Sequence, residues 1–268
     1  MPNDFYERIR SLKLAANKSL GQNFLIDEDI CERIVKEVGI EEGDNVLEIG
    51  AGLGSLSYYL VKNNAEITLI DIDETMLIEL NNQFGKRSNV KILRQNILKY
   101  DVSSFDRIVG NLPYYITSGI ISHVLLNSTN AKTIVFMTQK EVLQKLLPNS
   151  KEISPLSLLL NHVASINIVK NVSRYSFVPV PHVDSIVFKL TPNENIKNPL
   201  NKEVYDLMNQ IFLHRRKTIL NCLSNVVKDK NLAGQILKDL NINELKRPEQ
   251  LDIDFYFSLK REIKKHTI

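Results

Sequence analysis

The chain has 268 residues, of which 43% are apolar and 24% charged, a composition typical of a protein with a full hydrophobic core. It has no uncharged apolar stretch of about eighteen residues and no apolar signal core near the N-terminus, so we expect neither a transmembrane helix nor a signal for export. Cys31 and Cys222 lie far apart and form no CxxC pair, so neither a disulfide framework nor a cysteine zinc site is expected. We therefore expect a cytoplasmic protein that does not contact membranes.

Charge is distributed unevenly along the chain. Residues 192–268 hold 14 Lys and Arg against 10 Asp and Glu, whereas residues 1–191 hold 20 against 21. A basic C-terminal part suits a domain that contacts phosphates, and a solvated basic face is the plainer alternative.

The first two thirds of the chain alternate between helix and strand patterns. A helix is predicted over 27–38, with Asp27 as its N-cap and Gly39 as its stop. The further predicted strands are 46–50, 66–71, 89–94, 105–110 and 133–138, and the further predicted helices are 55–63, 73–84, 117–126 and one from 139 to Pro148. The strands are near-continuous apolar runs, so helices should cover both faces of the sheet. The pattern predicts a Rossmann-like, doubly wound α/β fold.

The remainder of the chain indicates a second domain. Residues 154–191 should complete the α/β part with one helix and two strands, INIVK (166–170) and DSIVFKL (184–190). An Asn- and Pro-rich stretch at 191–201 is typical of a linker, and helical periodicity continues from there to the end. We predict an α/β domain over 1–191 and a small all-helical domain over 192–268.

A glycine loop, EIGAGLGSL, follows the first strand of the sheet. Gly50 and Gly52 allow a tight turn and a close approach of the backbone to a ligand. Asp71 ends the next strand, where its carboxylate can accept hydrogen bonds from both hydroxyls of a ribose. These features predict a site for a nucleoside-containing cofactor, and a purely structural glycine turn is the alternative.

The spacing of this loop is G-x-G-x-G, whereas dinucleotide sites favour G-x-G-x-x-G. With Glu48 before it, the loop resembles the first motif of S-adenosylmethionine-dependent methyltransferases, and Ile72 would join the contacts to that cofactor. Such methyltransferases usually carry an aspartate after the third strand, which accepts from the adenine amino group. Asn96 stands there instead and can accept through an uncharged oxygen, while Ile97 adds a backbone N–H and an apolar face.

The segment GNLPYYITSG follows the fourth predicted strand, beside the expected cofactor crevice. Methylation of an exocyclic amino group requires acceptors for its hydrogens and a lone pair aimed at the methyl group. The side-chain oxygen of Asn111 and the carbonyl of Leu112 are suitable acceptors. Pro113 stiffens the turn, and the ring of Tyr114 can stack on a base.

This segment also has a plainer interpretation, a proline-terminated turn in which Tyr114 fills the core. The second aromatic residue, Tyr115, receives no role, and we expect it to pack inward without touching substrate.

Four segments together resemble the ribosomal RNA adenine dimethyltransferases along nearly the whole chain. They are KSLGQNFLID (18–27), NLPY (111–114), FVPVPHVDS (177–185) and HRRKTILN (214–221). The resemblance implies that Gln22, Asn23 and Leu25 fold over the methionine end of S-adenosylmethionine. Gly50, Asp71, Asn96 and Asn111 would complete the pocket for this cofactor. Phe177 would face Tyr114 across a flipped-out base.

The family has a housekeeping branch that acts on small-subunit rRNA and a resistance branch that acts on large-subunit rRNA. Three motifs resemble the housekeeping branch: the leucine of NLPY (111–114), VDS (183–185) and RRKT (215–218). This implies an enzyme that dimethylates N6 of two adjacent adenines in the 3'-terminal hairpin of 16S rRNA within an immature 30S subunit. It would act as a monomer, convert S-adenosylmethionine to S-adenosylhomocysteine and need no metal. The five histidines show no metal-ligand spacing.

The resemblance also implies that Arg215, Arg216 and Lys217 contact the RNA backbone, so that 192–268 is an rRNA-binding domain and 1–191 the catalytic domain. Three alternatives stay open. The three cations could cap the preceding helix. The chain could methylate 23S rRNA and confer antibiotic resistance, or be a non-catalytic RNA-binding assembly or transcription factor.

Overall fold

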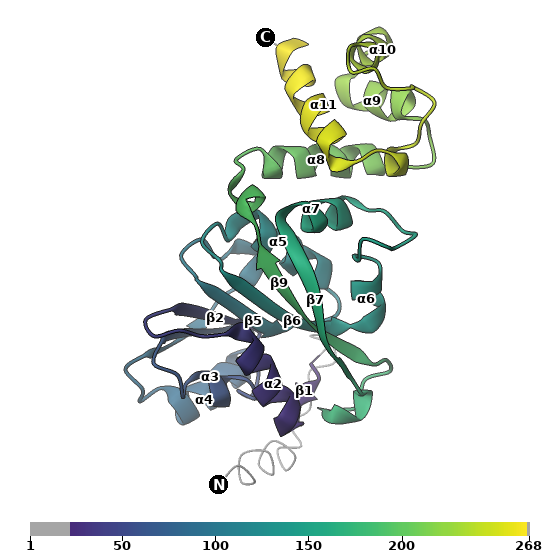
Figure 1. Cartoon of the computed structure of the whole chain (residues 1–268). Helices are drawn as coiled ribbons and strands as arrows, with labels where there is room; N and C mark the ends of the chain where they lie inside the picture. Colours follow the sequence, from purple (N-terminus) through teal and green to yellow (C-terminus); the bar gives the residue numbers. More distant parts are fainter. Residues whose placement is uncertain (1–21, 267–268) are drawn as a thin grey trace. The chain divides into compact units, whose positions relative to one another are not determined.

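A seven-stranded sheet organises the larger of two compact units of the chain (Figure 1). The computed structural model describes residues 22–266. Within them the strands of this sheet are β2 (Asn45–Ile49), β3 (Glu66–Asp71), β4 (Val90–Arg94), β5 (Arg107–Asn111), β6 (Thr133–Gln139), β7 (Ala164–Val172) and β9 (Ser185–Pro192). Their order is β4-β3-β2-β5-β6-β9-β7. Neighbours from β4 to β6 are parallel, and β9 runs antiparallel to both β6 and β7.

The burial of the strands follows their place in the sheet. The central strands β2, β5 and β6 are buried along nearly their whole length, as their apolar sequences predict. The edge strands β4 and β7 are largely exposed or half-buried. The predicted doubly wound α/β fold is therefore confirmed.

The helices of this α/β unit (residues 22–144 and 164–193) lie between the strands in sequence. They are α2 (Glu28–Val38), α3 (Ser57–Leu60), α4 (Glu74–Phe84), α5 (Thr117–Asn127) and α6 (Lys140–Gln144), with 3-10 turns η2 (Ile97–Lys99) and η3 (Arg174–Ser176). In α2, Asp27 accepts a hydrogen bond from the Ile30 N–H, and Gly39 ends the helix with φ of 64°. Both predicted caps of this helix are confirmed. Helices α3 and α6 are shorter than predicted, and α6 ends at Gln144 rather than at Pro148.

A two-stranded ladder that the sequence did not reveal joins distant segments of the α/β unit. Strand β1 (Phe24–Leu25) pairs antiparallel with β8 (Phe177–Val178), so that Leu25 lies opposite Phe177. The N–H of Ile26 donates to the carbonyl of Ser176 at 2.9 Å and extends the pairing.

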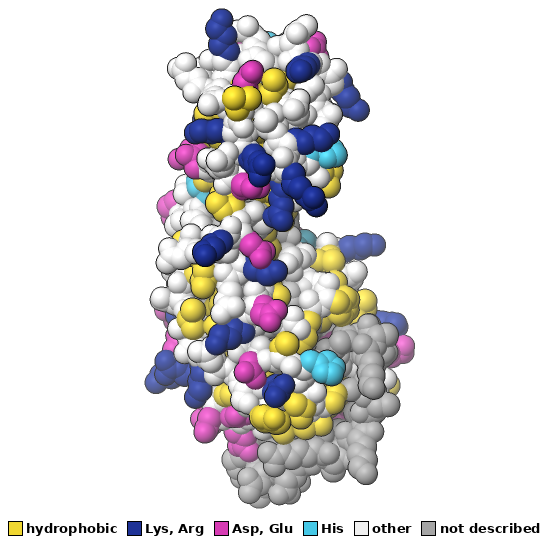
Figure 2. Space-filling model, turned by 90° about the vertical axis from the view of Figure 1, so that its right-hand side faces the viewer, with side chains coloured by type: hydrophobic (Ala, Val, Ile, Leu, Met, Phe, Trp, Pro, Cys, Tyr) yellow, Lys and Arg dark blue, Asp and Glu magenta, His cyan; other side chains and the backbone are white. Residues whose placement is uncertain are grey.

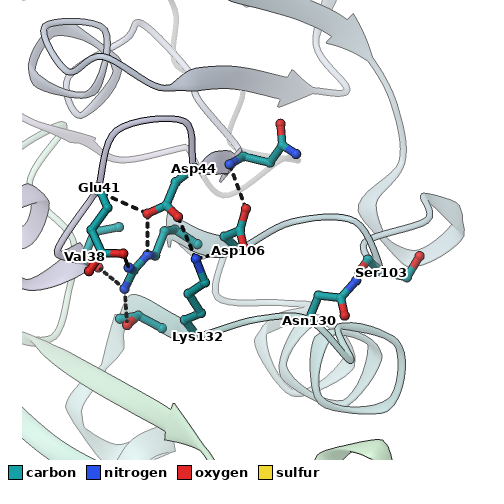
Figure 3. Close-up of polar contacts among 10 residues, drawn as sticks. Val38, Glu41, Asp44, Ser103, Asp106, Asn130 and Lys132 are labelled. Carbon is teal, nitrogen blue, oxygen red and sulfur yellow. Dashed lines mark hydrogen bonds and ion pairs between the residues drawn. The ribbon is translucent and has the colours of Figure 1, made fainter.

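A buried ion pair lies at the amino ends of the central strands (Figure 3). The Arg107 guanidinium, at the start of β5, donates from Nε to Asp44 at 2.8 Å and from Nη1 to Thr133 at 2.9 Å. Lys132 adds a contact of 3.0 Å to the same carboxylate. Burial by itself raises the pKa of Asp44, but hydrogen bonds from the Glu41 N–H, Lys132 and Arg107 hold it below its ordinary value.

The second unit comprises residues 145–163 and 194–266 and is helical. Its elements are α7 (Pro155–Val163), η4 (Glu194–Lys197), α8 (Asn201–Phe212), α9 (Ile219–Val227), α10 (Lys230–Asp239), η5 (Pro248–Gln250) and α11 (Ile253–His266). Its core is formed mainly by apolar side chains from α8 to α11. Among residues 22–266, no helix combines the length and the apolar character needed to cross a bilayer.

The division between the units differs from the predicted boundary at residue 191. Residues 145–163, which the sequence assigned to the α/β domain, belong to the helical unit. The reason is packing: Leu158 of α7 joins the core of the helical unit, and the His162 ring lies 5.1 Å from that of Phe257. Asn195 adds a hydrogen bond of 3.1 Å to the His162 carbonyl. The expected linker also contains η4 rather than only irregular chain.

Candidate active site

A pocket of about 250 Å³ opens in the α/β unit at the carboxyl ends of β2, β3 and β5. Five chain segments line most of it, namely 22–25, 48–56, 70–72, 95–98 and 111–116. The carboxyl edge of parallel strands is where α/β sheets bind ligands. Every predicted cofactor residue among 22–25, 48–52, 71–72 and 96–97 lines this one pocket.

The glycine loop forms one wall of the pocket. Gly50 and Gly52 have φ of 68° and 55°, which residues with a Cβ adopt at a cost. The N–H groups of Gly50 and Ala51 donate to the Ile70 carbonyl at 2.9 and 3.1 Å and bind the loop to the end of β3. A Cβ on Gly52 would stand 3.4 Å from the Phe24 ring, so the backbone approaches its neighbours closely here.

Asp71 links this loop to the start of α4. Its carboxylate accepts from the Gly52 N–H and from the Asp73 N–H, both at 2.9 Å. Burial raises its pKa, and backbone N–H groups oppose that rise. Gln22 donates to the Asp73 carboxylate at 2.8 Å, which ties the segment before β1 to the same corner.

Glu48 is a buried carboxyl group in the pocket wall, with 2% of its surface exposed. Ser57 donates a hydrogen bond to it at 2.5 Å. Burial, reinforced by the negative charge of Asp71, raises the pKa of Glu48 to about 8 against the hydrogen bond from Ser57. The protonated, neutral form of this group is therefore favoured below about pH 8.

The residues after the third parallel strand form a 3-10 turn at the pocket. The side-chain oxygen of Asn96 caps η2 by accepting from the Leu98 N–H at 3.0 Å. A carbonyl oxygen has two lone pairs, so this bond leaves one acceptor position on Asn96. Ile97 is buried at 6% exposure, whereas Ile72 is 50% exposed at the pocket.

The Asn111–Tyr114 turn forms another part of the pocket wall and is held at several points. Asn111 donates from Nδ2 to the Asn23 carbonyl at 3.2 Å, and the buried Leu112 donates its N–H to the Met137 carbonyl at 2.9 Å. Thr117 donates to the Pro113 carbonyl at 3.0 Å.

The Tyr114 hydroxyl lies 3.1 Å from the Ser185 hydroxyl at the start of β9, which anchors the far end of its ring. Burial raises the pKa of this phenol against the effect of the Ser185 hydrogen bond. The ring is thus fixed at both ends, yet Tyr114 lines the pocket and does not simply fill the core.

Two aromatic residues differ from expectation. Phe177 is 1% exposed in β8, belongs to the same core cluster as Leu25 and is not among the residues that line the pocket. Its apolar ring gains more from the core than from solvent. Tyr115 was expected to pack inward, but it is 57% exposed and lines the pocket.

The predicted RNA contacts belong to the helical unit. Arg215, Arg216 and Lys217 are exposed on the turn between α8 and α9, and Figure 2 shows Lys and Arg side chains gathered over this unit. Within the described part of the chain, none of the three side chains makes a hydrogen bond to a helix carbonyl or an ion pair.

One group of possible metal ligands, Asp239, Glu262 and His266, comes together in the helical unit, with ligand atoms within 4.8 Å of one another. The histidine spacing gave no sign of it, because Asp239 is distant in sequence. Gln235 bonds to Asp239 at 2.7 Å and Lys265 to Glu262 at 2.7 Å, so both carboxylates already have protein partners.

Comparisons with known proteins agree with this geometry. Residues 13–265 match the family described as ribosomal RNA adenine dimethylase. The chain is 34% identical over 268 residues to ribosomal RNA small subunit methyltransferase A of Lactobacillus delbrueckii subsp. bulgaricus, covering 92% of this chain and 90% of that protein. It is 36% identical over 258 residues to the protein of the same name from Mycoplasma capricolum subsp. capricolum, covering 92% and 97%.

Solved structures give the same result. A dimethyladenosine transferase from Plasmodium falciparum superposes with a TM-score of 0.74 at 28% identity, covering 90% of this chain and 98% of that one. The 23S rRNA methyltransferase ErmE superposes with a TM-score of 0.63 at 22% identity, covering 90% and 100%, and shows that the fold is shared. The chain therefore belongs to the ribosomal RNA adenine dimethylase family.

Proposed function

We propose that this chain transfers methyl groups from S-adenosylmethionine to N6 of two adjacent adenines in the 3'-terminal hairpin of 16S rRNA, dimethylating both. It acts on an immature 30S subunit, as a monomer in the cytoplasm. One observation carries the proposal: the Asn111–Tyr114 turn forms a wall of the same pocket as the glycine loop and Asp71. The names of the relatives that match over most of the chain support the small-subunit target.

The pocket fits the cofactor on its own geometry. The glycine loop brings backbone within reach of a ligand where a side chain would stand, and Asp71 offers carboxylate oxygens beside it. Ile72 and Ile97 supply apolar surface for an adenine, Asn96 retains an acceptor position for its amino group, and Glu48 lies in the wall near the loop. We assign Gln22, Asn23 and Leu25 to the methionine end.

S-adenosylmethionine supplies an electrophilic methyl group when bound. The protein's own residues position the nucleophile. The Asn111 oxygen and the Leu112 carbonyl accept the hydrogens of the adenine amino group, which directs its lone pair away from the ring. Pro113 limits the motion of these acceptors, and no strong base is required because the nitrogen becomes acidic only after methylation.

The base itself is held by Tyr114, whose ring is anchored through Ser185. A base in a duplex must leave its stack to reach such a pocket, and an aromatic ring replaces part of the lost stacking. Phe177 takes a supporting role in this proposal, since it packs opposite Leu25, a pocket residue. Arg215, Arg216 and Lys217 bind RNA phosphates from the helical unit.

The test is incubation of the protein with methyl-labelled S-adenosylmethionine and small subunits from cells that lack this methylation. We expect label in the subunit rRNA, located by mass spectrometry on two adjacent adenines of the 3'-terminal hairpin. If no label entered the rRNA, the enzymatic proposal would be rejected and a non-catalytic RNA-binding factor would be favoured. Label that appears only when large-subunit rRNA is supplied would favour the resistance branch.

A further inference from the structure

Tyr115 is a large aromatic side chain left outside the core at the pocket. It is 57% exposed, although its neighbour Leu112 is 1% exposed and Tyr114 is half-buried. An exposed ring adds little to folding stability compared with a buried one. Single exposed apolar residues are ordinary, so exposure alone carries no conclusion.

The position of the ring is what distinguishes it. Of the nine large apolar side chains that are exposed in the described residues, three line this one pocket, namely Ile72, Leu98 and Tyr115. We call these three residues the apolar rim. Clustering of exposed apolar surface at a pocket marks a ligand contact more often than scattered exposure does.

Hydrogen bonds hold the backbone that carries Tyr115. The N–H of Ile116 donates to the Pro113 carbonyl at 3.3 Å, closing the turn that contains Tyr115. Thr117, the first residue of α5, donates to the same carbonyl and lies 3.2 Å from the Thr138 hydroxyl. The ring is therefore presented from a fixed turn and not from a free loop.

Leu98 also lies near the start of α5. A Cβ placed on Gly119, in the first turn of α5, would stand 3.6 Å from the Leu98 side chain. Ile72, by contrast, directly follows Asp71 and belongs to the end of the pocket assigned to the cofactor. Tyr115 directly follows Tyr114, the residue assigned to the target base, and both line the pocket.

We propose that Tyr115 is a stacking platform for the nucleotide next to the adenine being methylated. This inference rests on the proposed function, in which the two target adenines are adjacent. When one of them is extruded into the pocket, its neighbour loses a stacking partner. A flat ring one residue from Tyr114 supplies a replacement, and stacking accepts either adenine of the pair because both have the same face.

The test compares Tyr115→Ala, Tyr115→Phe and the wild type on small subunits from cells that lack the methylation. Loss of one base–aromatic stack should raise the KM for subunits about five-fold or more in Tyr115→Ala, while Tyr115→Phe stays within about two-fold of wild type. The matched control is Ile78→Ala, since Ile78 is equally exposed at 57% but lies on α4 away from the pocket residues.

A second measurement distinguishes whether Tyr115 contacts the RNA nucleotide or the cofactor. Calorimetric titration with S-adenosylhomocysteine should give the same Kd for wild type and Tyr115→Ala. A weakened Kd in Tyr115→Ala with an unchanged KM for subunits would mean that the ring covers the cofactor, and the proposal would be overturned. Unchanged values of both constants would overturn it as well.

Failure of the proposed function has a different signature. In that case the wild type itself would transfer no methyl group to subunits. Equilibrium binding of the same subunits to wild type and Tyr115→Ala then decides the platform separately: equal affinities reject it, and a loss of about five-fold or more supports it.

Discussion

The side-chain amide of Asn111 donates from Nδ2 to the backbone carbonyl of Asn23 at 3.2 Å. This bond joins residues 88 positions apart and fixes which end of the amide is the acceptor. Asn23 belongs to the segment that continues into the β1–β8 ladder, so the ladder, the cofactor segment and the proposed acceptor are mechanically linked. Because an amide oxygen accepts and an amide nitrogen donates, this orientation is the one that receiving an amino group requires.

Asn111→Ala removes this acceptor and should reduce turnover about 100-fold to 1,000-fold, the usual loss when one transition-state hydrogen bond is deleted. Affinity for S-adenosylhomocysteine should fall much less, because the glycine loop and Asp71 remain. Methyl transfer to small subunits and calorimetry measure the two quantities.

The control for that variant is Asn63→Ala. The Asn63 amide bonds to the carbonyls of Tyr59 and Leu60 and does not line the pocket. Its turnover should match wild type. If Asn111→Ala also turned over normally, Asn111 would be a structural residue only.

A second prediction concerns Arg215, Arg216 and Lys217, which are exposed on one turn of the helical unit. Replacing all three by alanine should weaken subunit binding and make the slope of log affinity against log salt shallower by about 2 to 3, since each phosphate contact contributes about 0.7 to 0.9. Filter binding over a range of salt concentrations measures this slope.

The matched control replaces cations of the same unit that already have protein partners. Lys197 pairs with Glu194 at 3.2 Å and Lys264 with Glu203 at 2.8 Å. Lys197→Ala with Lys264→Ala should leave the salt slope nearly unchanged. Equal slopes for the triple variant and the wild type would speak for a structural role of the basic turn.

Local sequence was sufficient where the determinants of structure are local. Asp27 and Gly39 mark the two ends of α2 because capping depends on a few adjacent residues. The apolar runs of β2, β5 and β6 correctly predict strands that are buried on both faces. The meeting of the pocket segments in one place also follows from a general rule, because the carboxyl ends of parallel strands lie at the same edge of a sheet.

Features that depend on distant partners were not predictable. Strands β1 and β8 have two residues each and show no periodicity, so only their pairing reveals them. The sequence of α7 shows an apolar face but not which of the two cores it packs against. In the structure it packs against the core of the helical unit. Residue type alone does not determine whether an aromatic side chain points into the core or towards solvent. In the structure Tyr115 is exposed and Phe177 is buried.

A third prediction addresses the buried ion pair between Arg107 and Asp44, which are 7% and 3% exposed in their side chains. Arg107→Leu should destabilise the α/β unit by about 3–5 kcal/mol, because it leaves a buried carboxylate without its main partner. Urea unfolding followed by circular dichroism measures the loss. Arg94→Leu, which breaks an exposed pair with Glu74, should cost less than about 1 kcal/mol. Similar losses in both variants would contradict a special role for the buried pair.

The pair also has a pH signature. The pKa of Asp44 is held below its ordinary value of 3.8, so its stabilising contribution is complete above that value. It should disappear as the pH falls further and the carboxylate is protonated. The stability difference between wild type and Arg107→Leu should therefore shrink in acid, and a difference that stayed constant there would contradict the ionised pair.

The last prediction follows from Glu48, whose pKa in the folded protein is raised to about 8 from an ordinary value of 4.5. Between these pH values the folded group keeps its proton while the unfolded group loses it, so stability falls as pH rises from 4.5 to about 8. One group contributes at most about 1.4 kcal/mol per pH unit to this fall. Glu48→Gln keeps the shape and still accepts from Ser57, but it cannot ionise.

The Tm of Glu48→Gln should therefore nearly equal that of wild type at about pH 5 and exceed it increasingly towards pH 8. Thermal unfolding of the protein without added S-adenosylmethionine, at four pH values across this range, measures the difference. Glu66→Gln, at an exposed position that starts β3, is the control and should follow the wild-type curve because solvent screens its charge. Parallel curves for Glu48→Gln and wild type would mean that Glu48 is ionised in the folded pocket, where it would then be available as a negative charge for a cationic ligand.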